Sequence, residues 1–187
     1  LPTTNWNGKY QAVGNGGLAG SVLYEPLSDA LKRGYAASST DTGHVGDTAK
    51  DFLGHPEKQI DFAYRAIHEM TLKAKVITGA FYGNDPRLSY FVGCSGGGRQ
   101  ALMEAQRYPN DFHGIVAGAP SLNQKPIVFA ARMGISHAAL KNPASFIPRT
   151  KYPMIHQAVV NACDATDGLK DGLIDDPRRC SFDPKVL

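Results

Sequence analysis

The feature that most constrains this chain is a serine bounded by glycines at a predicted strand-to-helix junction. Residues 93–97 have the sequence GCSGG and fit the pattern G-x-S-x-G. Residues 89–92 (SYFV) predict a short buried strand before the serine, and residues 97–107 predict a helix after it. The alternative is a glycine-rich turn used only for packing or phosphate contact, but both elements that a nucleophile elbow requires are predicted here.

Glycines on both sides of the serine allow a turn so tight that larger side chains would collide with neighbouring strands. The serine hydroxyl then projects above the sheet at a helix N-terminus, where the helix dipole and free N–H groups favour developing negative charge. We therefore predict Ser95 as a nucleophile and the N–H of Gly96 as one oxyanion donor. Cys94 is not expected to be the nucleophile, because Ser95 occupies the apex of the turn.

Strand and helix patterns alternate through the first two thirds of the chain. Short β-like runs cover residues 9–13, 34–38 and 114–120. A long helix is predicted over residues 57–82, because apolar residues recur there by three and four. Its predicted core face consists of Ile60, Ala63, Ile67, Met70, Ala74, Ile77 and Phe81. The alternation predicts an α/β fold with a mostly parallel sheet flanked by helices.

The helix after the serine and the segment beyond residue 120 complete this pattern. In the helix, Ala101, Leu102 and Ala105 are expected to face the core. Beyond residue 120 the periodicity weakens, and Pro, Asn and Lys become frequent. We therefore expect residues 1–120 to form the sheet domain and residues 121–187 to begin a separate domain.

The second oxyanion donor is expected from an earlier strand-to-helix loop. Residues 14–17 (GNGG) follow the first predicted strand, and the N–H of Gly16 or Gly17 is the candidate. Residues 14–19 also fit G-x-G-x-x-A, so a dinucleotide-dependent oxidoreductase domain is an alternative. Two features count against it: Pro26 is expected to interrupt the following helix, and Asp41 lies beyond the usual acidic position about 20 residues on.

An acidic loop near the end of the sequence is the second strong feature. Asp164, Asp167 and Asp171 lie within eight residues, and two of them are followed by glycine. Such a loop can surround a hard cation such as Ca²⁺, which binds six to eight oxygens. The loop does not fit the EF-hand, and a solvated turn without metal is the alternative.

Composition excludes some classes of function. The chain is 42% hydrophobic and 20% charged, with a net charge of +3 that is not gathered in a basic stripe. We therefore expect no nucleic-acid partner. No apolar run approaches the roughly 20 residues of a membrane span, so no membrane role is expected. Three cysteines are an odd number, which in an exported protein implies one pair and one partner outside this chain.

The sequence resembles the tannase and feruloyl esterase family, which also includes a hydrolase of terephthalate monoesters. The resemblance covers nearly the whole chain. Its motifs are residues 5–10 (NWNGKY), 13–17 (VGNGG), 39–44 (STDTGH), 54–58 (GHPEK), 93–100 (GCSGGGRQ) and 117–120 (AGAP). Gly96 stands where Thr or Asp is frequent in the family, but an oxyanion donor needs only the backbone N–H.

The resemblance implies an α/β-hydrolase core and the start of an inserted calcium-binding lid. It also implies a serine carboxylic-ester hydrolase with a Ser-His-Asp acyl-enzyme mechanism. Its substrates would be phenolic esters, feruloyl esters first and galloyl esters second, with terephthalate monoesters as a further alternative. An inactive calcium-binding module is the alternative from another class.

The resemblance also assigns individual residues. It implies that one structural Ca²⁺ is bound by the carboxylates of Asp164, Asp167 and Asp171 and by the backbone oxygens of Leu169 and Leu173. Cys163 and Cys180 flank this loop, and a disulfide between them would stabilise it by roughly 3 kcal/mol. The family pairs the cysteine before the nucleophile with one that follows the catalytic histidine, so Cys94 is expected to pair outside this chain. Disulfides indicate a secreted or periplasmic protein.

The triad acid and histidine are not expected among these residues, because both follow the nucleophile on later strands in this fold. The histidines expected to have structural roles are His44, His55, His113, His137 and His156. We therefore expect the remainder of the same protein, or a second chain, to supply the acid and the base.

Overall fold

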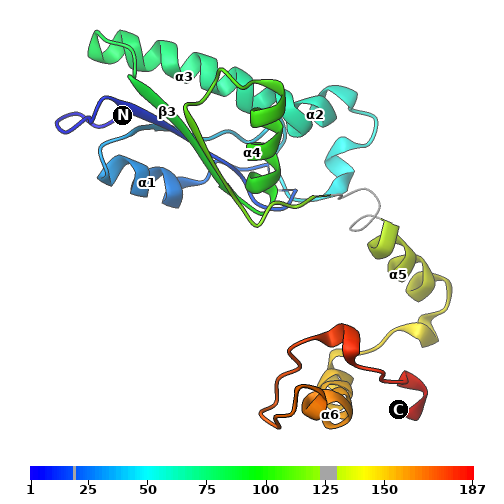
Figure 1. Ribbon diagram of the computed structural model, residues 1–187. Coiled ribbons are helices and arrows are strands. Elements are labelled where there is room, and N and C mark those ends of the chain that lie inside the picture. Colours follow the sequence, from blue (N-terminus) through cyan, green and yellow to red (C-terminus); the bar gives the residue numbers. More distant parts are fainter. Residues whose placement is uncertain (19, 123–129) are drawn as a thin grey trace. The chain divides into compact units, whose positions relative to one another are not determined.

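The structure is a computed structural model that describes residues 1–18, 20–122 and 130–187 (Figure 1). It divides into two compact units, Leu1–Asn123 and Gln124–Leu187. The first unit contains the sheet, and the regular elements described in the second unit are all helical. Ala19, the last residue of the dinucleotide-like pattern, lies outside the described residues.

The sheet of the first unit has four parallel strands in the order β2-β1-β3-β4. The strands are β1 (Lys9–Val13), β2 (Ala36–Ser38), β3 (Leu88–Cys94) and β4 (Gly114–Gly118). The predicted parallel sheet is therefore confirmed. Figure 1 shows α3 and α4 on one face of the sheet and α1 on the other.

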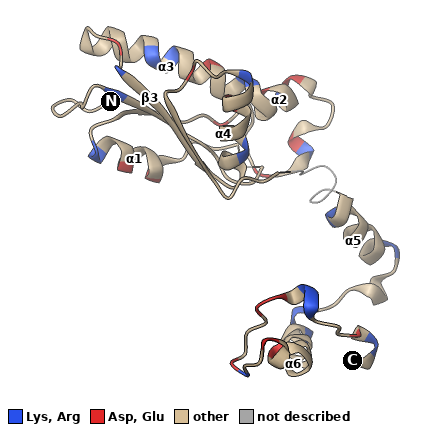
Figure 2. Cartoon of the chain, in the orientation of Figure 1, with Lys and Arg blue, Asp and Glu red and all other residues tan. Residues whose placement is uncertain are grey.

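The predicted helix of residues 57–82 is confirmed, with one irregular turn. It consists of α2 (Pro56–Ile60), a π-helical turn η2 (Asp61–Arg65) and α3 (Ala66–Tyr82). The carbonyl groups of Phe62 and Ala63 in the π turn accept hydrogen bonds from the guanidinium of Arg99 at 2.9 and 3.0 Å. Arg99 thereby joins this turn to α4 (Gly96–Arg107). Figure 2 shows residues of both charges along α2 and α3.

The predicted core face of α3 is partly wrong. Ile67 is buried, but Ile77 and Phe81 are 59% and 55% exposed. Thr71 and Thr78 are buried instead, each with its hydroxyl donating to the carbonyl four residues earlier. A threonine satisfied in this way can enter a core, and a search for apolar residues alone does not detect it.

The inward face of α4 also differs from the prediction. Ala101 is buried, but Leu102 and Ala105 are exposed. Gln100 and Glu104 occupy the buried positions. The core between α3, α4 and the sheet is formed by Tyr10, Ala12, Ala36, Ile67, Phe91, Ala101 and Phe112.

The expectation that Pro26 interrupts a helix is wrong. Helix α1 (Tyr24–Lys32) contains Pro26 as its third residue. The N–H groups of a first helical turn have no partner within the helix, so a proline there removes no hydrogen bond.

The second unit consists of short helical segments. They are α5 (Ala130–Lys141), η4 (Pro143–Ser145), η5 (Arg149–Lys151), α6 (Tyr152–Cys163), η6 (Asp164–Asp167), η7 (Pro177–Arg179) and η8 (Pro184–Val186). A disulfide joins Cys163 at the end of α6 to Cys180 just after η7, so this predicted pair is confirmed. Among the described helices of both units, none has the length and apolarity needed to cross a bilayer.

Candidate active site

Ser95 is the single residue between β3 and α4, and its backbone is in a rare conformation. Its φ of 57° and ψ of −114° lie outside the regions that non-glycine residues commonly adopt. The turn is held by hydrogen bonds from Ser95 N–H to the carbonyl of Gly118 and from Arg99 N–H to the carbonyl of Ser95, both 3.0 Å long. The strand-turn-helix context expected of a nucleophile elbow is therefore present.

The hydroxyl of Ser95 is accessible, because the residue is exposed at the N-terminus of α4. The Ser121 hydroxyl lies 3.5 Å from the Ser95 hydroxyl, at the limit of a hydrogen bond. The Ser121 N–H donates to the carbonyl of Ser95 at 3.1 Å. An exposed hydroxyl on a strained, hydrogen-bonded turn is suited to attack an external electrophile.

Glycines around Ser95 allow the loop of residues 14–17 to lie directly on the start of α4. A Cβ on Gly96 would be 2.8 Å from the carbonyl oxygen and 3.0 Å from the nitrogen of Gly17. A Cβ on Gly97 would be 2.9 Å from the carbonyl oxygen of Asn15. Any larger residue would push the two segments apart.

The structure thus brings the three predicted oxyanion residues together. Gly96 contacts the backbone of Gly16 and Gly17, although about 80 residues of sequence separate them. Gly17 has a φ of 58°, which favours glycine, and there is open space beside both Gly16 and Gly17. Backbone N–H groups at this point could receive a developing oxyanion. Their catalytic role stays a prediction.

The histidines of the sheet unit have other partners. His44 is buried, with Nε2 2.7 Å from the carbonyl of Leu18, and its ring contacts Phe52 and Phe62. His113 Nδ1 accepts the N–H of Ser89 at 3.1 Å. Of the remaining predicted structural histidines, His55 precedes α2, His137 is in α5 and His156 is in α6, and all three are exposed.

Sequence reasoning missed an Asp-His pair. His68 Nδ1 lies 2.6 Å from the Asp111 carboxylate, and the ring stacks on Tyr108 at 3.8 Å. These residues pack just beyond the C-terminal end of α4, and a helix of this length places them about 18 Å from Ser95. The pair therefore cannot serve Ser95 as acid and base. No local sequence signal predicts it, because its members are 43 residues apart.

The acidic loop of the second unit is folded on itself. Asp164 accepts a hydrogen bond from the N–H of Gly172 at 2.9 Å, which closes the loop across eight residues. Asp167 and Asp171 accept from the N–H groups of Leu169 and Leu173 at 2.8 and 3.0 Å. These carboxylates have the chemistry that Ca²⁺ prefers. Over the described residues, however, no three acidic, His or Cys side chains are gathered closely enough to hold a metal, and the calcium site stays a prediction.

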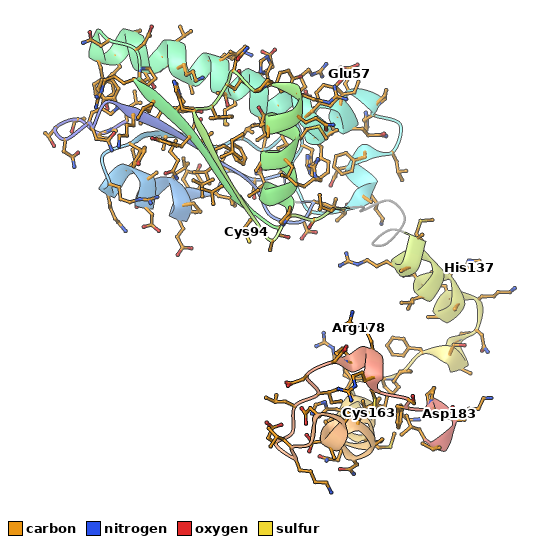
Figure 3. All side chains as sticks on the ribbon, viewed as in Figure 1. Glu57, Cys94, His137, Cys163, Arg178 and Asp183 are labelled. Atoms are coloured by element: carbon orange, nitrogen blue, oxygen red, sulfur yellow. A yellow bond between two sulfur atoms is a disulfide. The ribbon has the colours of Figure 1, made fainter. Side chains whose placement is uncertain are left out.

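Cys94 and the Cys163–Cys180 disulfide are in different units. Cys94 ends β3, is exposed, and is a free thiol (Figure 3). Its expected partner outside this chain stays a prediction. Cys163 and Cys180 bracket the acidic loop, with 5.3 Å between their Cα atoms.

These features define a class of protein. A parallel sheet flanked by helices, with a strained serine at a strand-to-helix turn and glycines that admit a second loop, is the arrangement of an α/β hydrolase. Over residues 1–187 the chain matches the family model described as tannase and feruloyl esterase. The chain therefore belongs to the tannase and feruloyl esterase family.

Individual relatives agree with this assignment. Feruloyl esterase B of Aspergillus niger is 40% identical over 177 residues, which are 95% of this chain and 34% of the relative. The crystal structure of feruloyl esterase B from Aspergillus oryzae superposes with a TM-score of 0.79 at 36% identity, covering 98% of this chain and 37% of that one. The tannin acyl hydrolase from Aspergillus niger gives 0.69 at 26% identity, with coverages of 98% and 35%. The chain thus spans about a third of the length of these relatives.

Proposed function

We propose that this chain carries the nucleophile of a serine carboxylic-ester hydrolase that acts on phenolic esters. The observation that supports this most directly is the exposed Ser95 hydroxyl on a strained turn, with the Gly16–Gly17 backbone packed against Gly96. Feruloyl esters are the proposed substrates, because the structural match to a feruloyl esterase is 36% identical and the match to a tannin acyl hydrolase is 26% identical. Galloyl esters are the second candidate.

The proposed reaction proceeds by an acyl-enzyme. The Ser95 oxygen attacks the ester carbonyl, and its proton passes to a histidine base. The negative charge that develops on the carbonyl oxygen is stabilised by the N–H groups of Gly96 and of Gly16 or Gly17. The alcohol leaves with the proton, and water then hydrolyses the acyl-serine to release the acid.

We further propose that the acid and base belong to sequence outside these 187 residues. Over the described residues, Ser95 has no histidine partner, and the relatives are about three times as long as this chain. The exposed Cys94 and the 59% exposed Val116 of β4 lie where further chain would pack. Cys94 is proposed to form a disulfide with a cysteine of that further chain. A protein with these disulfides is expected to be secreted or periplasmic.

The second unit is proposed to begin a lid that one Ca²⁺ stabilises. The carboxylates of Asp164, Asp167 and Asp171, with the backbone oxygens of Leu169 and Leu173, would hold the ion. The ion would neutralise three carboxylates in one loop and restrain its turns, a structural contribution rather than a chemical one.

Labelling with a fluorophosphonate tests the proposed function. The polypeptide encoded by the gene should bind one equivalent of the probe, and Ser95→Ala should abolish both labelling and ester hydrolysis while the protein remains folded. Rates on methyl ferulate and methyl gallate then distinguish the two substrates. Labelling or hydrolysis that persists in Ser95→Ala would disprove the assignment, and a protein that never labels would favour the inactive calcium-binding module.

A further inference from the structure

A buried pair of amide side chains joins the glycine loop to the helix that begins at Ser95. Asn15 directly precedes Gly16 and Gly17, and Gln100 lies in the second turn of α4. Both residues are only 3% exposed. The Asn15 N–H donates to Gln100 Oε1 at 2.9 Å, and Gln100 Nε2 donates to Asn15 Oδ1 at 3.0 Å. The two hydrogen bonds are reciprocal, so they define both the distance and the tilt between the segments.

The Asn15 side chain has no polar group to spare. Its Nδ2 donates to the carbonyl of Ser21 at 2.8 Å and to the carbonyl of Thr40 at 2.7 Å. Asn15 therefore joins the loop to three segments, namely α4, the stretch before α1, and the stretch after β2. Because each partner is buried or part-buried, moving the loop would leave unsatisfied polar groups, which cost about 1 to 3 kcal/mol each.

The position of this pair relative to the nucleophile suggests its role. Glycine-to-glycine contacts allow the loop to approach Gly96 and Gly97, but van der Waals contact alone permits sliding. The hydrogen bonds from Asn15 and Gln100 remove that freedom. Oxyanion donors are effective only when they are already aimed at the developing charge before the reaction begins.

We propose that Asn15 and Gln100 are positioning residues, which set the N–H groups of Gly16 and Gly17 at the height of the Ser95 oxygen. This inference rests on the proposed function, since an oxyanion requires the ester reaction. Neither side chain touches the substrate. Their contribution is to fix the geometry of the loop whose N–H groups contact the substrate.

Gln100→Glu is the most informative variant, because it preserves the volume of the side chain. The ionised carboxylate still accepts the Asn15 N–H, but its second oxygen is an acceptor and faces Asn15 Oδ1, which is also an acceptor. The hydrogen bond that Gln100 Nε2 donates is therefore lost. A protonated carboxyl can donate to that oxygen and restore the pair. Arg99 and Glu104 of the same helix are present in both proteins, so the variant is compared with the wild type at each pH.

The test is steady-state hydrolysis of methyl ferulate by the protein as encoded by its gene, together with inhibition by a phenylboronic acid. The boron adds to a serine oxygen and mimics the tetrahedral anion. At pH 8 we expect Gln100→Glu to lower kcat by about 100-fold, as loss of one oxyanion donor does, with KM changed less than about threefold. The boronate affinity should fall in parallel, and the activity ratio to wild type should recover by about tenfold or more at pH 5. Thr78→Val is the matched control, because it removes a buried side-chain hydrogen bond from α3 and should leave kcat unchanged.

Other outcomes would overturn the inference. If Gln100→Glu lowers only the melting temperature, as Thr78→Val is expected to do, the pair is merely structural. The same conclusion follows if the variant lowers kcat while its boronate affinity is unchanged and its activity relative to wild type is the same at pH 5 and pH 8. If either of these results is found while the wild type is active and Ser95→Ala is inactive, it refutes the positioning role and leaves the proposed function intact. If the wild type neither labels nor hydrolyses esters, both the proposed function and this inference fail.

Discussion

Glu104 should make this protein less stable as the pH rises, and the substitution Glu104→Gln should remove that dependence. Its side chain lies between α4 and the sheet and is 1% exposed, and its Oε2 has no hydrogen-bond partner among the described residues. Burial, and secondarily the nearby Asp111 carboxylate, raise the pKa of Glu104 from an ordinary value of 4.5 to about 8. The folded protein therefore holds this proton more tightly than the unfolded chain does.

The sign and size of the effect follow from linkage. The stability associated with Glu104 is fully present below pH 4.5 and is lost as the pH rises to about 8, because the folded state must then bury a charge or retain a proton that the unfolded state releases. A pKa raised this far corresponds to about 4 to 5 kcal/mol over that interval. Glu104→Gln has no proton to lose, so its stability relative to wild type should rise by about that amount from pH 4.5 to pH 9.

Urea denaturation of both proteins between pH 5 and pH 9 measures this difference. Glu69→Gln is the control, because the Lys73 ammonium lowers the pKa of that exposed carboxyl. The contribution of Glu69 to stability therefore changes only at lower pH, and the stability of this variant relative to wild type should stay nearly constant between pH 5 and pH 9. A stability difference between Glu104→Gln and wild type that stays constant across the range would refute the reasoning, as would a variant that is the less stable protein at pH 9.

Three further predictions concern the turn and the second unit. Gly97→Ala should lower the free energy of unfolding by about 1 to 3 kcal/mol, because the new methyl group overpacks against the backbone of Asn15 and Gly14. Gly134→Ala meets open space in α5 and should raise the free energy of unfolding by about 0.5 to 1 kcal/mol. Thermal denaturation that shows equal effects of the two substitutions would contradict the packing argument. Replacing Cys163 and Cys180 together by serine should lower the free energy of unfolding by about 3 kcal/mol, and an unchanged urea midpoint would exclude a stabilising role for this disulfide. Chelation with EDTA should lower the melting temperature and Asp167→Asn should reduce that response, while calorimetry that detects no Ca²⁺ binding would rule out the metal site.

The strand and helix order was predictable from the sequence because each signal is local. Apolar runs bounded by glycine and proline locate β1, β3 and β4, and spacing by three and four locates α2 and α3. Side-chain direction was predicted less well. Ile77 and Phe81 are exposed while Thr71, Thr78, Gln100 and Glu104 are buried, because a polar residue enters a core when tertiary partners or helix carbonyls satisfy it, and those partners are distant in sequence.

The sequence by itself determined that Ser95 sits at a tight strand-to-helix turn, since glycine spacing and the flanking patterns are encoded within about 20 residues. It also indicated the glycine loop of residues 14–17 as a candidate donor and the cysteines that bracket the acidic loop. Only the tertiary structure decided that this loop lies against Gly96 and that Asn15 and Gln100 join the two segments. It also showed that the Asp-His pair of Asp111 and His68 lies at the far end of α4 from Ser95. The physical reason is the parallel sheet: it places β1 beside β3, and loops some 80 residues apart in the chain come into contact only when those strands pair.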